Sequence, residues 1–252
     1  MSFDVSAGAY GQFMGRYSTP LARLFADLAD PQRGFRVLDV GCGPGALTAE
    51  LVSRVGVAAV SAVDPSQPFV ASVRDRYPGL DVQLAAAEAL PYPDATFDQT
   101  LAQLVVHFMT DPVAGLTEMR RVTRPGGVIA ASVWDFGRER APLSVFWRAA
   151  RDLDPATNDE SGLPGARAGD LIRLFGLAGL TGSTETTLTV QARYETFDQW
   201  WEPYTLRVGP AGAHVASLAP QAQSDLRERC KQLLPAGPIE ITATAWAVRC
   251  RV

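Results

Sequence analysis

The chain has little cysteine, little histidine and no concentrated positive charge. Its 252 residues include three cysteines and two histidines, and the formal net charge is −4. The cysteines form no C-x-x-C pair, so neither a disulfide framework nor a metal site is predicted, and a cytoplasmic location is expected. Without a strongly basic surface, a nucleic-acid partner is not expected either.

Long apolar runs are also missing. The first 17 residues lack the basic start and apolar core of a secretory signal, and no stretch approaches the roughly 20 apolar residues of a membrane span. We therefore expect no membrane partner. The hydrophobic content of 47% and charged content of 20% are usual for a globular protein. A chain of this length can bury a core without disulfides or metal, so a single domain over residues 1–252 is predicted.

Strands and helices alternate over the first half of the chain. Short apolar runs predict strands, and residues with helical spacing lie between them; the strand segments are 35–40, 57–63, 80–85, 97–102 and 128–134. This alternation predicts an α/β fold with a mostly parallel sheet. Residues 188–194 and 239–247 instead alternate apolar and polar side chains, which favours an antiparallel edge.

Two flanking segments complete the predicted domain. Residues 1–34 are expected to form an N-terminal cap, with a helix that begins near Ser18 or Thr19 and has Pro20 in its first turn. Residues 196–236, between the two alternating strands, read as helices. We expect this insertion to form a lid over one face of the domain.

The main chemical signal lies in residues 37–45, which read VLDVGCGPG. Gly41, Gly43 and Gly45 follow an apolar strand and precede a helix, so the backbone can approach a ligand beside the helix N-terminus. Asp39 lies inside the strand, where a charge must be paired or hydrogen-bonded. Its carboxylate is expected either to fix the loop or to meet a cationic group of the ligand. A tight turn with glycines for packing is the simpler interpretation of the loop alone.

Asp64 strengthens the interpretation of the glycine loop as part of a nucleotide-binding site. It ends the second predicted strand, 23 residues after Gly41, where an acid can bind ribose hydroxyls. Gly41, Gly43 and Ala46 also satisfy the G-x-G-x-x-A pattern of NAD(P)-binding oxidoreductases, which remain an alternative. Asp39 within the strand and the later motifs speak against that alternative.

Four motifs together carry a resemblance to a known family: VLDVGCGPG, VDPS at 63–66, AEALPYPDATFD at 87–98 and EMRRVTRPGG at 118–127. The combination resembles the class I S-adenosylmethionine-dependent methyltransferases, in particular the branch related to quinone-biosynthesis enzymes. It covers roughly residues 35–135. The resemblance implies a Rossmann-like, seven-stranded, mostly parallel sheet with an antiparallel last strand and helices on both faces. It also implies S-adenosyl-L-methionine as the cofactor.

The resemblance assigns cofactor-binding roles to individual residues. The methionine moiety would lie along Gly41, Cys42 and Gly43, with Asp39 behind the loop. Arg16 would either pair with the methionine carboxylate or belong to an ordinary amphipathic packing helix. Asp64 would bind the ribose, with Pro65 and Ser66 beside the adenosine. Ala87 and Glu88 would contact the adenine. The carbonyl of Gln103 would bind the amino group of the cofactor. Many relatives have an acid before the Ala–Glu pair, whereas this chain has Ala86, which puts the strength of the adenine contacts in doubt.

Methyl transfer from a sulfonium is an in-line displacement that needs a base only if the acceptor must lose a proton. His107 is the candidate general base, and packing against Phe108 and Met109 is its alternative role. Aromatic residues are candidates either for the wall of an acceptor pocket or for packing: Trp134, Trp147, Trp200, Trp201 and Tyr204. The sequence therefore predicts a methyltransferase acting on an oxygen, nitrogen or carbon atom of a small molecule. A cofactor-binding protein without transfer activity is the other alternative.

Overall fold

A seven-stranded sheet forms the centre of the molecule in the computed structural model, which describes residues 6–252. The strand order is β3-β2-β1-β4-β5-β7-β6. The strands are β1 (Val37–Val40), β2 (Val60–Asp64), β3 (Asp81–Leu84), β4 (Phe97–Gln103), β5 (Thr123–Trp134), β6 (Thr184–Tyr194) and β7 (Ile239–Arg251). The first five strands pair in parallel, and β7 is antiparallel to both β5 and β6. The predicted α/β fold with an antiparallel last strand is confirmed.

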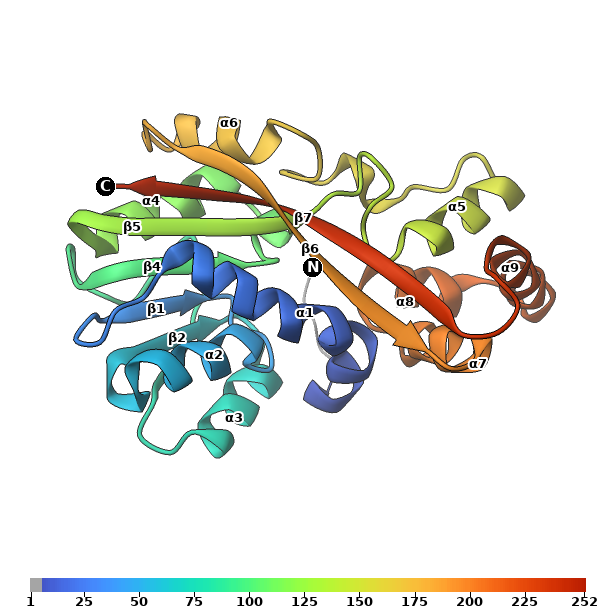
Figure 1. The fold of residues 1–252 in the computed structure, drawn as a ribbon, viewed down its shortest axis with the longest axis horizontal. Helices are drawn as coiled ribbons and strands as arrows, with labels where there is room; N and C mark the ends of the chain where they lie inside the picture. The colour runs from blue at the N-terminus through green and yellow to red at the C-terminus, as the bar shows by residue number, and fades with distance from the viewer. Residues whose placement is uncertain (1–5) are drawn as a thin grey trace.

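Helices cover both faces of the sheet (Figure 1). Those of the first half and of the connection to β6 are α1 (Ala7–Ala29), α2 (Ala46–Val55), α3 (Gln67–Arg76), α4 (Pro112–Val122), α5 (Ser144–Leu153) and α6 (Asp170–Leu177). Apolar side chains of α1, α2 and α3 form one core with the sheet, and α4 and α6 pack on the opposite face. Within the described part of the chain, four short 3₁₀ helices interrupt the loops: η1 (Val57–Ala59), η2 (Val106–Phe108), η3 (Glu160–Gly162) and η4 (Glu202–Leu206).

The segment between β6 and β7 is helical, with α7 (Phe197–Trp201), η4, α8 (Gly209–Ser217) and α9 (Pro220–Leu233). In Figure 1 these helices gather with α5 at one end of the molecule, beyond the parallel strands. A third core joins them to α1, with Phe146 stacked on Tyr204 at 4.6 Å between ring centroids. The long strands β6 and β7 extend from the sheet into this group of helices, so they position it relative to the parallel strands.

The N-cap of helix α1 lies twelve or thirteen residues earlier than the sequence pattern suggests. This N-cap is Ser6, whose side chain accepts a hydrogen bond from the Ala9 N–H, and Pro20 lies inside the helix. The predicted start at Ser18 or Thr19 is therefore wrong. Buried side chains on both sides of Pro20, among them Tyr17 and Leu21, pack continuously against the core and hold the helix through the proline. Residues 1–5 of the predicted cap lie outside the described residues.

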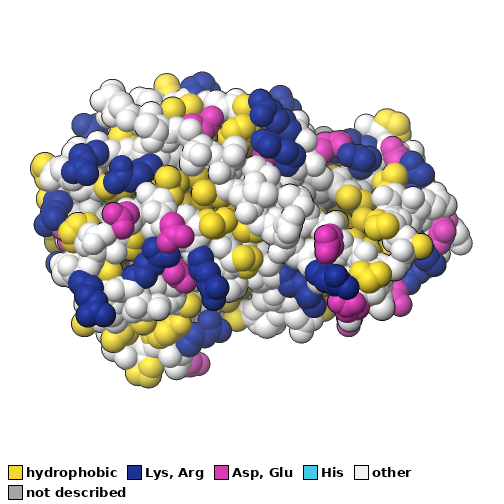
Figure 2. Space-filling view, in the orientation of Figure 1, with side chains coloured by type: hydrophobic (Ala, Val, Ile, Leu, Met, Phe, Trp, Pro, Cys, Tyr) yellow, Lys and Arg dark blue, Asp and Glu magenta, His cyan; other side chains and the backbone are white. Residues whose placement is uncertain are grey.

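Charges of both signs are interspersed on the face shown in Figure 2. No helix within residues 6–252 combines the length and the apolar character that crossing a bilayer requires.

Candidate cofactor and acceptor site

A pocket of about 390 Å³, here called the glycine-loop pocket, opens at the carboxyl ends of β1, β2 and β4. β1 pairs with β2 on one side and with β4 on the other. The connections leaving β1 and β4 therefore diverge, which leaves a crevice where ligands of parallel sheets bind. Ten residues singled out from the sequence line the pocket: Asp39, Gly41, Cys42, Gly43, Asp64, Pro65, Ser66, Ala87, Glu88 and Gln103.

Arg16 does not line this pocket. Its guanidinium lies over the Tyr194 ring, 5.0 Å from the centroid, and donates a hydrogen bond to the Arg193 carbonyl at 3.2 Å. Tyr10 and Ser18 are the residues of α1 that line the glycine-loop pocket. At about 100° per residue, Arg16 lies roughly 120° around the helix from Tyr10 and so faces β6. Arg16 is thus the one residue predicted to bind the cofactor that is not among the residues lining the glycine-loop pocket.

The glycine loop is held close to neighbouring strands and helices. The N–H groups of Gly41 and Cys42 both donate to the Val63 carbonyl, at 2.8 and 3.0 Å. Gly41 has φ of 69°, and a Cβ there would lie 2.4 Å from a methyl group of Val105. A side chain at position 41 would thus be both strained and obstructed, so this glycine is required for the loop to lie against Val105, which follows β4.

Asp39 and Asp64 give the pocket two buried carboxyl groups. Asp39 is 1% exposed; its Oδ2 accepts from Thr48 Oγ1 at 2.6 Å, while Oδ1 is buried without a partner. Burial raises the pKa of Asp39 to about 7, the Thr48 hydrogen bond opposes the rise, and the nearby Asp64 adds to it. Among the described residues, Asp39 therefore has no ion-pair partner, and its Oδ1 accepts no hydrogen bond.

Asp64 connects the end of β2 to the glycine loop. Its Oδ2 accepts from the Gly43 N–H and its Oδ1 from the Ser66 N–H, both at 2.8 Å. Burial raises the pKa of Asp64, and the two backbone hydrogen bonds oppose that rise. Each carboxylate oxygen has a second lone pair, so Asp64 can still accept a hydrogen bond from a ligand in the pocket.

The polar lining is acidic and rich in acceptors. Asp39, Asp64 and Glu88 line the pocket, whereas no Lys, Arg or His among residues 6–252 does. The Gln103 amide donates to the Ser18 carbonyl at 3.0 Å, which leaves its Oε1 buried without a partner. These acceptors suit a ligand that carries positive charge and N–H or O–H donors. A pyrophosphate would instead bring its charge against three carboxylates.

A much smaller cavity adjoins the glycine-loop pocket. We call it the inner cavity; its volume is about 30 Å³, and Tyr10, Leu104 and Phe108 line both spaces. His107 lies in the wall of the inner cavity and not in that of the larger pocket. Complete burial lowers the pKa of His107 to about 3, so the imidazole is neutral at neutral pH. Its ring contacts Phe108, with centroids 3.9 Å apart.

Some of the aromatic residues predicted to line an acceptor pocket or to pack in the core lie in the wall of the inner cavity, and the others pack in the core. Trp134 lines the inner cavity, and Trp147 donates from its indole nitrogen to Glu160, which lines it too. Trp200, Trp201 and Tyr204 line neither space and pack in the core with α5. Sequence reasoning missed Leu104, Val105 and Glu160. The first two are ordinary apolar residues, and Glu160 lies in an irregular segment without a recognisable motif.

Residues 38–131 match a protein family described as "Methyltransferase domain". An uncharacterised methyltransferase of Mycobacterium tuberculosis is 37% identical over 140 residues, covering 56% of this chain and 54% of that protein. A ubiquinone biosynthesis O-methyltransferase of Rhizobium johnstonii is 37% identical over 122 residues, or 47% of this chain and 48% of that protein. The chain thus spans about half or less of the length of the curated relatives it matches.

A solved structure extends the likeness over most of the fold. Geranyl diphosphate C-methyltransferase from Streptomyces coelicolor, in complex with S-adenosyl-L-homocysteine, gives a TM-score of 0.57 over 94% of this chain and 80% of that chain, at 13% identity. Its low identity makes this a similarity of fold alone. The sequence match and the fold confirm the predicted family: residues 38–131 belong to the methyltransferase domain family, in the class I fold. The resemblance to the quinone-biosynthesis branch is confirmed by the Rhizobium relative.

Proposed function

We propose that the protein transfers a methyl group from S-adenosylmethionine to a small-molecule acceptor. The observation that carries the proposal is the acidic lining of the glycine-loop pocket, which includes no Lys, Arg or His among residues 6–252. S-adenosylmethionine has an ammonium group and a sulfonium centre, and both are favoured beside Asp39, Asp64 and Glu88. The same lining disfavours NAD(P), whose pyrophosphate is anionic.

Individual roles follow from the contacts already described. Asp39 and Gln103, which line the pocket, are proposed to lie beside the ammonium group, and Asp64 is proposed to accept from the ribose hydroxyls. Glu88 accepts from the backbone N–H groups of Thr110 and Asp111, at 2.7 and 3.2 Å, and so holds the wall proposed to lie beside the adenine. When bound, the cofactor supplies an activated methyl group, and the residues of the chain align it and exclude water.

The flanking helices are proposed to enclose the acceptor. Tyr10 on α1 contributes to both spaces, and Gly209 and Pro210 of α8 line the inner cavity. We therefore keep the single domain of residues 1–252, with the cap at 1–34 and the lid at about 196–236, as part of the proposal. The lid would separate the methyl group from solvent during transfer.

The proposal is tested by two measurements on the same preparation. Titration calorimetry is expected to give saturable binding of S-adenosylhomocysteine and no response to NAD⁺. Incubation with S-adenosylmethionine labelled in its methyl group, together with an extract of small molecules, is expected to give a labelled product. Binding without a product would favour the non-catalytic alternative, and binding of NAD⁺ in place of S-adenosylhomocysteine would overturn the proposal.

The substitution His107→Ala is expected to leave the affinity for S-adenosylhomocysteine within about twofold. Its side chain lies outside the glycine-loop pocket, so it contributes no contact to the bound cofactor. A pKa near 3 also makes the imidazole a weak proton acceptor, so hydrogen bonding to the acceptor suits His107 better than general-base catalysis. Calorimetry on the folded variant checks the affinity. A tenfold loss would mean that His107 belongs to the cofactor site.

A further inference from the structure

The inner cavity is too small for an acceptor in this conformation. Its volume of about 30 Å³ is the space of roughly one water molecule. The glycine-loop pocket, at about 390 Å³, lies near the lower end of the range of about 300–1,000 Å³ found for ligand pockets, and the proposed cofactor would occupy it. An acceptor therefore finds room beside the cofactor only if part of the cavity wall moves.

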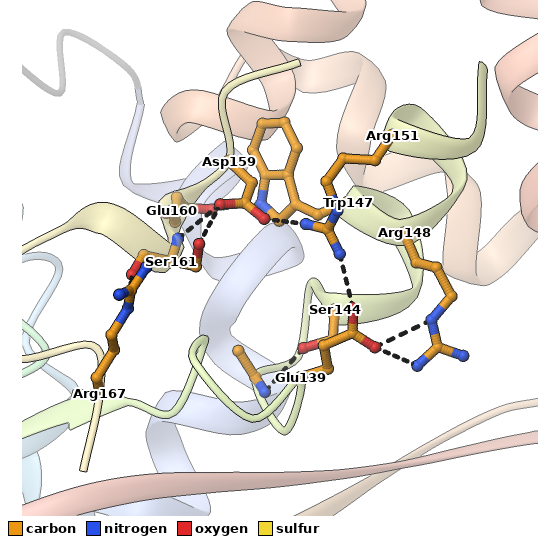
Figure 3. Close-up of polar contacts among 10 residues, drawn as sticks. Glu139, Ser144, Trp147, Arg148, Arg151, Asp159, Glu160, Ser161 and Arg167 are labelled. Carbon is orange, nitrogen blue, oxygen red and sulfur yellow. Dashed lines mark hydrogen bonds and ion pairs between the residues drawn. The ribbon is translucent and has the colours of Figure 1, made fainter. Parts of the chain in front are cut away.

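Most of the wall of the inner cavity is held in place. Figure 3 shows how the turn η3, which carries Glu160, is fixed to α5: Asp159 pairs with Arg151, and Glu160 accepts from Trp147 Nε1 at 2.8 Å. The wall residues of η2 and of the end of β5 are attached to inner strands of the sheet. The lid contributes the first residues of α8, and its helices share an apolar core with α5.

Helix α1 supplies the part of the wall that is held less firmly. Tyr10, Phe13 and Met14 line the inner cavity. Tyr10 also lines the glycine-loop pocket, and its ring contacts Phe69 of α3, which lines that pocket too. Residues 6–15, here called the gate segment, include no charged residue, so no ion pair can hold them. Withdrawal of this segment would enlarge the inner cavity and join it to the glycine-loop pocket.

The gate segment is also a poor helix former. It contains Gly8, Gly11 and Gly15, and glycine is the least favourable residue in a helix apart from proline. A Cβ at Gly11 or Gly15 would meet nothing within 4 Å, and neither residue has a positive φ. Packing and backbone geometry therefore do not require glycine at these two positions. Their presence weakens the first part of α1, as expected of a segment that has to open.

From Arg16 onwards α1 is anchored to the rest of the fold. The Arg16 guanidinium lies over the Tyr194 ring of β6, and the Tyr17 hydroxyl accepts a hydrogen bond from the Tyr194 hydroxyl at 2.8 Å. Beyond Pro20, the buried side chains of α1 pack with α2 and the sheet. The change from an anchored helix to a glycine-rich one thus falls between Gly15 and Arg16.

We propose that the gate segment opens by local unfolding to admit the methyl acceptor, and that Arg16 and Tyr17 are the anchors at which this opening stops. The inference rests on the proposed methyl transfer. Local opening begins where helix propensity is low and polar contacts are few, which describes residues 6–15 and not the rest of α1. The lid at about 196–236 stays in place during this step and forms the fixed side of the acceptor chamber.

Thiol labelling tests the opening directly. Met14→Cys places a thiol at a position that is 7% exposed in the gate segment, and Leu21→Cys places one at a position that is 0% exposed in the anchored part. The native cysteines 42, 230 and 250 are buried, and the wild type gives their background reaction with a chromogenic disulfide reagent. We expect Met14→Cys to react at least 100-fold faster than Leu21→Cys. Equal rates would overturn the inference, because α1 would then open as one unit.

Alanine in place of two glycines should keep the gate closed. Gly11→Ala together with Gly15→Ala is expected to slow the labelling of Met14→Cys at least tenfold, since each alanine favours the helix by roughly fivefold. Gly176→Ala is the matched control, because Gly176 is an exposed residue of α6 whose Cβ would also meet nothing within 4 Å. It should leave the labelling rate within twofold. Equal slowing by the control would reduce the effect to overall stability and overturn the inference.

Formation of the labelled product connects the opening to the reaction. At acceptor concentrations below saturation, its rate follows the fraction of open protein. The double substitution of Gly11 and Gly15 should therefore lower this rate at least fivefold, while the affinity for S-adenosylhomocysteine stays within threefold. Slower labelling with an unchanged product rate would show that the gate does not admit the acceptor. Absence of product from the wild type would contradict the proposed function, and the labelling rates would then decide the gate by themselves.

Hydrogen exchange on the wild type needs no introduced cysteine. The amides of residues 11–15 lie beyond the first turn of α1, so they are hydrogen-bonded while the helix is closed. Mass spectrometry is expected to show that they exchange at least 100-fold faster than the amides of residues 22–29, and that the double substitution of Gly11 and Gly15 slows them at least tenfold. Equal protection along the whole helix would contradict a gate at residues 6–15.

Discussion

Asp39→Asn is expected to stabilise the cofactor-free protein at pH 8, by about 1–3 kcal/mol, while it weakens cofactor binding. The wild-type carboxylate is 1% exposed and one of its oxygens has no partner, so its charge is costly in the folded state. Asparagine keeps an oxygen to accept from Thr48 Oγ1 and carries no charge. Urea unfolding at pH 8, followed by circular dichroism, measures the gain.

The sign and the pH range follow from the pKa of Asp39. Burial raises this pKa from 3.8 to about 7, so between these values the folded state binds more protons than the unfolded state. Stability contributed by the protonated carboxyl is complete below pH 4 and is lost as the pH rises to 7, by at most about 4 kcal/mol. The advantage of Asp39→Asn should therefore vanish near pH 4. Asp75→Asn, at an exposed position on α3, is the matched control, and an equal gain there would contradict the explanation.

A costly buried charge of this kind is understandable if a ligand compensates for it. A cation beside Asp39 would favour the carboxylate, so cofactor binding should release a proton and strengthen between pH 5 and 8. In Asp39→Asn this pH dependence should be lost. The carboxylate of Asp39 would then lower the stability of the cofactor-free protein and raise its affinity for the cofactor. Such a trade-off between stability and function is common at functional sites.

The position of the glycine loop beside Asp64 was predictable because its determinants are local. A buried strand, the glycines at 41 and 43 and a following helix are adjacent in sequence, and Asp64 ends the next strand over. Parallel pairing of β1 with β2 then brings Asp64 to the loop, as shown by its hydrogen bond with Gly43. Once the sheet order is inferred from the family, these positions have little freedom.

Arg16 and Glu160 were beyond such reasoning for different reasons. The direction in which Arg16 points depends on the rotation of α1, which is set by packing on α2, β6 and η4 and not by local pattern. Glu160 meets His107 and Trp134 only after three distant segments fold together. A lone acid in an irregular stretch resembles any solvated surface residue, so its burial could be learned only from the tertiary structure.

Asp64→Ala is expected to weaken S-adenosylhomocysteine binding by about 1.5–3 kcal/mol, roughly 10- to 150-fold. The substitution removes a charged acceptor proposed for the ribose hydroxyls. It also removes the acceptor for the N–H groups of Gly43 and Ser66, both at 2.8 Å, so the loop loses its connection to β2. Calorimetry at pH 7.5 measures the affinity, and an unchanged value would show that the ribose assignment is wrong.

The contribution of Asp64 to ribose binding and its contribution to the glycine loop can be separated by changing the ligand. S-adenosylhomocysteine and its 2′,3′-dideoxyribose analogue are titrated into the wild type and into Asp64→Ala. If Asp64 binds the ribose, the wild type should prefer the ligand with hydroxyls at least tenfold, and the variant should lose that preference. Any affinity that the variant loses for the dideoxy analogue reports the loop alone, since this ligand has no hydroxyl to bind. A preference retained in full by Asp64→Ala would assign the ribose to another residue and leave Asp64 with the loop as its whole role.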